Sequence, residues 1–96
     1  MAKRKELDEN IKELKTKLLE GKVVLGTERV LKELKTKELE KIFLTSNCLQ
    51  KIVDDIKYYA KLAGITVVEL EQTNEEIGVI CKKNFFVSVV GIIKWD

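Results

Sequence analysis

A glycine followed by a charged helical segment is the part of this sequence best suited to bind an anion. The apolar run 23–25 stops at Gly26, and a helical pattern begins at once, with Arg29 in its first turn and Lys32 one turn on. A glycine lets another backbone approach closely, while the free N–H groups of a helix start and nearby basic side chains attract phosphate. The same residues also make an ordinary strand-to-helix corner, in which Glu28 and Lys32 have the spacing of a surface ion pair. On this segment alone, both interpretations stay open.

Two further loops carry side chains able to recognise a nucleic-acid base. Asn47 follows the apolar run 42–45, and its amide both donates and accepts hydrogen bonds. Asparagine is also a favoured helix N-cap, and with Gln50 three residues on we favour capping over base recognition. Phe85 and Phe86 stand at the start of the last apolar run, so we expect them to face opposite sides. One would fill the core, and the other would lie near the loops as a stacking platform for an unpaired base.

The residues needed for enzymatic chemistry are mostly missing. The sequence has no histidine, which excludes every triad, metal site and proton shuttle that depends on one. The acidic pairs Asp54-Asp55 and Glu75-Glu76 are sequence neighbours, which point in different directions on a helix, so we interpret them as solvated or helix-terminus charges. There is no P-loop or GxGxxG motif, and Cys48 has no evident partner base. The sequence therefore predicts a protein that is not an enzyme and needs no cofactor or metal.

Nothing in the sequence indicates secretion or insertion into a membrane. No apolar run approaches the roughly 18 residues needed to cross a bilayer, and the charged N-terminus does not lead into a signal-peptide core. Cys48 and Cys81 lie far apart and neither belongs to a CxxC motif, so we expect two reduced, half-buried thiols. The protein is expected to be cytoplasmic, with no membrane partner.

The charge is small and unevenly distributed. The net charge is +2, but residues 1–41 carry twelve Lys or Arg against nine Asp or Glu, while residues 42–96 carry six against seven. The basic excess thus lies in the half that contains Gly26. A modest patch of this kind suits RNA recognised by shape, whereas coating a duplex requires more charge, and no DNA partner is expected. Three lysines of the first helical segment fit a solvated face better than an RNA contact: Lys12, Lys15 and Lys17.

The order of the elements predicts the fold class. The 96 residues suffice for a single domain with one core. Residues 1–6 are charged and expected to be frayed. Strands are expected at 23–25, 42–45, 65–70 and 86–93, and helices from about residue 7 to Gly21, from a cap at Thr27, at 49–63, and at 73–81 with a Thr73–Glu76 capping box. This alternation predicts an α/β protein, a three-layer α/β/α sandwich around a central four-stranded mixed sheet.

Three loops follow strands and precede helices, at Gly26, at 46–47 and at 72–74. If the three strands run parallel, these loops lie at the same edge of the sheet, where ligands bind in open α/β folds. Gly78 lies inside the expected short helix, where glycine costs up to about 1 kcal/mol relative to alanine. We therefore expect either another backbone or a ligand to pass close to Gly78.

Together these motifs resemble the superfamily of archaeal and eukaryotic ribosomal proteins that bind kink-turn RNA. The branch that they resemble most is that of the large-subunit ribosomal protein "L thirty e", and the likeness spans about residues 10–93. The motifs that carry the resemblance occur in order and at the right spacing: Gly26-Thr27 with Lys32, Thr45-Ser46-Asn47, the segment DIKYYA at 55–60, and Asn74-Glu75-Glu76-Ile77-Gly78 followed by Phe85 and Val87.

The resemblance implies an α/β/α sandwich that grips a sharply bent RNA internal loop, as a structural component of the large ribosomal subunit. It implies RNA as the partner, with ribosomal proteins as possible neighbours. Contacts to tandem G·A pairs and phosphates map to Gly26, Thr27, Glu28, Arg29 and Lys32. A further RNA contact maps to Asn47, and Phe85 occupies the position that stacks on or packs beside a base. The loop that closes over flipped-out nucleotides maps to Asn74, Glu75, Glu76, Ile77 and Gly78.

Three features depart from that family's pattern. Glu28 stands where Asn, Lys or Arg is usual, and a carboxylate cannot donate a hydrogen bond and repels phosphate. Cys48-Leu49 replaces a small residue followed by proline, and the chain ends at Trp95-Asp96 without a glycine-containing tail. An alternative hypothesis is therefore a protein-interaction module or paralogue on the same fold, with altered or lost RNA binding.

Overall fold

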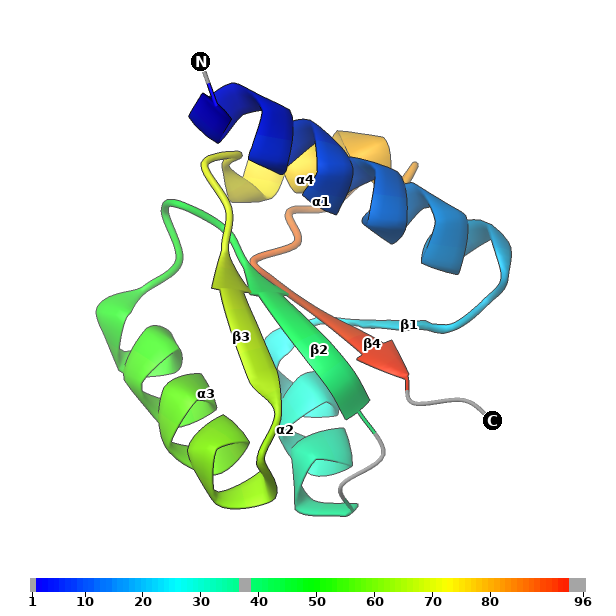
Figure 1. Ribbon diagram of the computed structural model, residues 1–96. Helices are drawn as coiled ribbons and strands as arrows, with labels where there is room; N and C mark the ends of the chain where they lie inside the picture. The colour runs from blue at the N-terminus through cyan, green and yellow to red at the C-terminus, as the bar shows by residue number, and fades with distance from the viewer. Residues whose placement is uncertain (1, 37–38, 94–96) are drawn as a thin grey trace.

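The computed structural model describes the backbone of residues 2–36 and 39–93, and side chains from residue 9 onward within those ranges (Figure 1). Helices and strands alternate after a long first helix. In chain order they are α1 (Ala2–Leu19), β1 (Val23–Leu25), α2 (Thr27–Thr36), β2 (Leu39–Leu44), α3 (Gln50–Ala63), β3 (Thr66–Glu69), α4 (Asn74–Ile80) and β4 (Val89–Ile93). The helix α1 is already formed at Ala2, within the segment for which the sequence predicts fraying.

The strands form one mixed sheet in the order β1-β4-β2-β3. Strand β4 is antiparallel to both β1 and β2, whereas β2 and β3 are parallel. Strands β1, β2 and β3 therefore all run in the same direction. The loops that leave these three strands meet at one edge of the sheet, and the chain enters β4 at that same edge.

Two helices cover each face of the sheet (Figure 1). Side chains alternate between the faces along a strand, so neighbouring residues of β2 belong to different cores. Ile42 and Leu44 are buried in one core with residues of α2 and α3, including Val30 and Ile56. Phe43 is buried in the other core with Leu14 of α1, with Ile77 of α4 and its C-cap Cys81, and with Val90 and Ile92 of β4. The predicted three-layer sandwich is confirmed.

The last helix has the predicted cap. The Thr73 side chain accepts from the Glu76 N–H, and the Glu76 carboxylate accepts from the Thr73 N–H. Gly78 is buried in this helix, and a Cβ added there would collide with the backbone carbonyl of Phe85. The neighbour expected at Gly78 is thus another stretch of backbone. This backbone is part of the segment between α4 and β4, which passes over α4 at Phe85.

The final strand begins later than the sequence predicts. Strand β4 starts at Val89, and both Phe85 and Phe86 are exposed, by 54% and 68%. The prediction that one of these rings fills the core is wrong. After α4, Lys82 takes a left-handed backbone conformation (φ 59°), and an irregular segment follows up to the strand. The apolar residue of this segment that reaches the core is Val87.

We predict that Gly78→Ala destabilises the protein, although alanine is the better helix former. The added methyl meets fixed backbone rather than a flexible side chain, so the free energy of unfolding should fall by about 1–3 kcal/mol. Urea denaturation followed by circular dichroism measures this change. Val79→Ala is the matched control on the same helix because Val79 is 70% exposed, and it should change little. A gain in stability for Gly78→Ala would contradict the close approach of the Phe85 backbone.

Candidate nucleic-acid interface

A short backbone segment, 87–89, ties the three predicted loops together. The Gly26 N–H donates to the Val89 carbonyl (3.0 Å), and the Thr45 N–H donates to the Ser88 carbonyl (3.1 Å). In the third loop, the Asn74 carbonyl accepts from the Val87 N–H (3.1 Å). Each loop thus makes one backbone hydrogen bond to the segment. The expectation that the three loops share one edge of the sheet is confirmed.

Two asparagines join the second loop to the third. The Asn74 N–H donates to Asn47 Oδ1 (2.9 Å), and Asn47 Nδ2 donates to Asn74 Oδ1 (3.1 Å). Asn74 Nδ2 in turn donates to Ser88 Oγ (3.3 Å). The Ser46 N–H adds a backbone bond to the Gln72 carbonyl (2.8 Å). The two loops are therefore held in register with each other and with the entry to β4.

The favoured reading of Asn47 as a helix cap is wrong. Helix α3 begins at Gln50, its N-cap is Leu49, and the cap makes no side-chain hydrogen bond. Asn47 lies instead in a turn closed by the Cys48 N–H and the Thr45 carbonyl (3.3 Å). Its amide has two hydrogens and two oxygen lone pairs, and the bonds to Asn74 use only half of these. Asn47 is exposed, so the remaining capacity is within reach of a ligand.

The first loop and the start of α2 form a corner, called the Gly26 corner below, that presents two exposed cations. Gly26 has φ +100°, a conformation that favours glycine, and a Cβ there would meet nothing within 4 Å. Thr27 is half-buried at the start of α2, while Glu28, Arg29 and Lys32 are exposed. Among the described residues, no ion pair joins Glu28 to Lys32, although their spacing allows one. Both cations of this corner therefore remain available to an anionic ligand.

The third loop presents fewer side chains than the resemblance implies. Glu75 is exposed, and Glu76 is occupied by the capping box. Ile77 is fully buried, and Gly78 is buried against the Phe85 backbone. These two residues therefore build the loop: the Ile77 side chain fills the core, and Gly78 leaves room for the Phe85 backbone. Asn74 and Glu75 are the members of this group best placed to meet a ligand.

Two residues of this edge are missing from the sequence-based site. Ser88 holds the Asn74 amide, and its only sequence signal is one hydroxyl within an apolar run. Lys83 lies with Arg29 and Phe85 around one hollow of the surface. A lysine two positions from an exposed aromatic is a weak signal by itself. Its significance comes from the fold, which places it around the same hollow as Arg29.

The two cysteines are free, as predicted, and one is more buried than expected. Cys48 is half-buried, whereas Cys81 is buried in the core. Burial raises the pKa of both thiols, and the charge of Lys83 opposes that rise at Cys81 to a smaller extent. Neither thiol is thus activated as a nucleophile.

In the part of the chain that is described, no group of three or more His, Cys, Asp or Glu residues could hold a metal ion. No helix of the described residues is long and apolar enough to span a bilayer.

This fold and its three-loop edge match a known class of proteins. The model of the ribosomal protein L7Ae/L30e/S12e/Gadd45 family matches residues 8–96, and the chain belongs to this family. The family resemblance drawn from the ordered motifs is thereby confirmed.

Curated relatives narrow the comparison to one branch. The large ribosomal subunit protein eL30 of Sulfolobus acidocaldarius is 41% identical over 81 residues, which cover 84% of this chain and 78% of that protein. The eL30 of Methanocaldococcus jannaschii is 36% identical over 93 residues, covering 97% and 84%. Among solved structures, the Giardia lamblia 15.5kD RNA binding protein superposes with a TM-score of 0.79 at 17% identity, covering 95% of this chain and 77% of that one. That likeness shows a shared fold.

We predict that the two asparagines are energetically coupled. Asn47→Ala and Asn74→Ala should each lower the free energy of unfolding by about 1 kcal/mol, because each removes hydrogen bonds between the loops. The double variant should lose less than the sum of the single losses, since both changes remove the bond from Asn47 Nδ2 to Asn74 Oδ1. Thermal unfolding of the four proteins measures the coupling. Asn84→Ala is the control, because Asn84 is exposed and makes no side-chain hydrogen bond with a described residue. Strict additivity would show that the pair does not hold the loops together in solution.

Proposed function

We propose that this chain is a ribosomal RNA-binding protein that recognises a kink-turn or kink-turn-like internal loop, as a structural component of the large subunit. The observation that carries the proposal is the joining of three loops to the segment 87–89, with exposed Arg29 and Lys32 and the half-used amide of Asn47 around it. Relatives at 35–41% identity bear the name of large ribosomal subunit protein eL30. Ribosome association in the cytoplasm follows as part of the same proposal.

The Gly26 corner suits a phosphate backbone at close range. The open space above Gly26 lets RNA approach the start of α2, where the first N–H groups have no partner within the helix. Arg29 and Lys32 extend this site with positive charge. Asn47 adds donors and acceptors suited to a base edge, and the exposed ring of Phe85 offers a stacking surface. A bent RNA concentrates phosphates, so a few well-placed groups on a protein of small net charge are sufficient.

The alternative of a protein-interaction module that has lost RNA binding rests on Glu28 and the small net charge. The names of the relatives do not favour it. These relatives are named as ribosomal proteins rather than enzymes, in agreement with the absence of histidine and of catalytic motifs. Glu28 is exposed in the first turn of α2, where a carboxylate also stabilises the helix N-terminus.

We predict selective binding to RNA that contains tandem G·A pairs. In a gel-shift titration, a kink-turn RNA should bind on the order of 100-fold more tightly than a control in which those pairs are replaced by Watson–Crick pairs, because the control cannot present the same bent loop. Arg29→Ala and Lys32→Ala should each weaken binding and reduce the salt dependence by about one ion. Lys61→Ala is the control, since Lys61 is exposed in the last turn of α3, away from the loops. Equal affinity for the two RNAs, or none for either, would contradict the proposal.

We predict that Glu28→Gln tightens binding to the same RNA severalfold. The change removes a charge that repels phosphate and keeps an oxygen acceptor at the same position. Fluorescence anisotropy at two salt concentrations measures the effect, which should shrink at the higher concentration. Glu40→Gln is the matched control, since Glu40 is exposed near the start of β2, at the end of the strand opposite to the loops. A loss of affinity in Glu28→Gln would show that the carboxylate itself contacts the RNA.

A further inference from the structure

A groove of about 700 Å³ lies between α1 and α4, on the face of the sheet opposite to α2 and α3 (Figure 1). Its floor is apolar, because Ile11 and Ile80 line it and pack against the core beneath while staying half-buried. Val79 also lines the groove and is 70% exposed. This groove, called the α1–α4 groove below, therefore leaves apolar surface of two helices open to a partner.

The two walls of the α1–α4 groove carry opposite charges. Lys12 and Lys15 line it from α1, and Glu75 and Glu76 line it from the first turn of α4. All four residues are exposed, yet no ion pair among the described residues joins the two walls. The Glu76 carboxylate accepts from the Thr73 N–H in the capping box, so Glu75 is the free carboxylate of the acidic wall.

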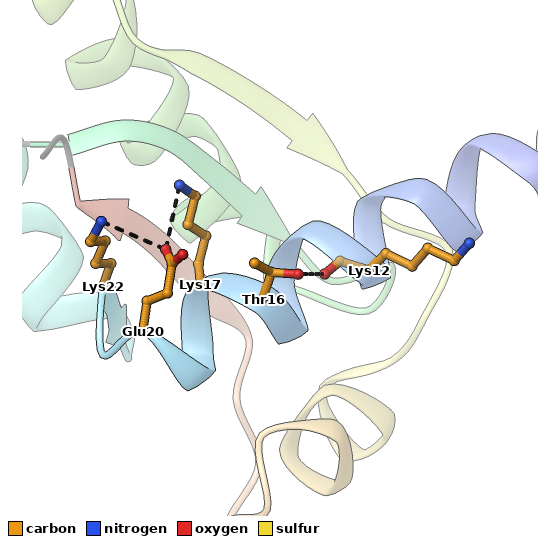
Figure 2. A network of polar contacts seen from close by, with 5 residues as sticks. All are labelled: Lys12, Thr16, Lys17, Glu20 and Lys22. Atoms are coloured by element: carbon orange, nitrogen blue, oxygen red, sulfur yellow. Dashed lines mark hydrogen bonds and ion pairs between the residues drawn. The ribbon is translucent and has the colours of Figure 1, made fainter.

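The basic wall differs from the rest of α1 in that its ammonium groups are not shared with a carboxylate. Near the end of α1, Lys17 and Lys22 both approach Glu20, at 3.8 and 3.6 Å (Figure 2). At Lys12 the backbone is engaged instead, because the Thr16 hydroxyl donates to the Lys12 carbonyl (2.9 Å). The Lys12 side chain points away from the Glu20 network (Figure 2). The cations of this wall are thus available to carboxylates of another molecule.

A basic wall and an acidic wall on either side of an apolar floor make a surface that is complementary to itself. In a two-fold symmetric dimer both copies use the same patch, so every contact between two different residues occurs twice. A two-fold axis through the groove places the basic wall of one copy against the acidic wall of the other. It also brings the exposed Val79 side chains of the two copies to the centre of the contact. A patch with charge of one sign would instead repel its own copy.

We propose that the α1–α4 groove binds a second copy of this chain in a two-fold symmetric dimer. Lys15 of each copy pairs with Glu75 of the other, and each Val79 packs on the apolar floor of the opposite groove. The proposal does not rest on RNA binding, since Arg29 and Lys32 belong to α2 on the other face of the sheet. The patch is small, so the dimer is expected to be a transient one, with a dissociation constant on the order of micromolar or weaker.

Sedimentation equilibrium of nuclease-treated protein tests the dimer in the absence of RNA. With rising concentration at low salt, the mass of the wild type should increase from 11.0 kDa toward about twice that value. Lys15→Glu alone and Glu75→Lys alone should each weaken self-association about tenfold, because each places like charges opposite each other twice. An equimolar mixture of the two variants should associate again, because opposite charges then meet at both positions.

A matched pair of apolar substitutions tests the centre of the contact. Val79→Ser should weaken self-association severalfold, because it removes apolar surface from the middle of the interface. Leu62→Ser is the control, since Leu62 is similarly exposed (65%) but lies on α3, on the opposite face of the sheet. It should leave the association unchanged. Circular dichroism of each variant checks that the fold is intact.

The outcomes separate the dimer from other occupants of the groove. A wild-type chain that stays monomeric up to millimolar concentration would overturn the proposal, and the partner of the groove would then be a different protein. Self-association that persists in both charge variants and in Val79→Ser would place the contact on another face and overturn it as well. Failure of the mixed variants to associate would exclude the two-fold pairing of the walls. None of these results bears on RNA binding, which the gel-shift titration measures separately.

Discussion

The structure of the candidate site depends on the hydrogen bonds of one segment of three residues. Residues 87–89 bond to Gly26, Thr45 and Asn74, which lie in three loops far apart in the sequence. The segment runs into β4, the strand that pairs with both β1 and β2. Its position is therefore set by the sheet, and the loops take their positions from it. Such a site is formed before binding and loses little conformational entropy when a ligand arrives.

Much of the fold is readable from the sequence because the apolar pattern has a clear period. The apolar residues at helical spacing before Gly64 predict α3, and the apolar run 42–45 predicts the second half of β2. The capping box at Thr73 is local chemistry, so it too is readable. The path of the chain between α4 and β4 cannot be read from the sequence, because an apolar run with two phenylalanines is equally typical of a strand. The close packing of this path on Gly78 decides the matter.

The arrangement of the candidate site is harder to read from the sequence than the fold is, for a physical reason. Sequence reasoning finds residue types, whereas a site depends on partners from other elements. Asn47 has the sequence position of a helix cap, yet its partner is Asn74 across the sheet edge. Lys83 and Arg29 become neighbours around one hollow only when the segment before β4 meets the start of α2. Ile77 belongs to a motif that the family resemblance places in the RNA site, yet its side chain is buried in the core.

The central claim is that the three loops bind RNA as one surface. An NMR titration of ¹⁵N-labelled protein with a kink-turn RNA tests it most directly, because it reports on every amide at once. We expect shifts in the amides of 26–29, 46–47, 74–75 and 83–88 that follow one binding isotherm, while the outer face of α3 around Lys61 stays unchanged. Shifts confined to one loop, or centred on another face of the protein, would contradict the account.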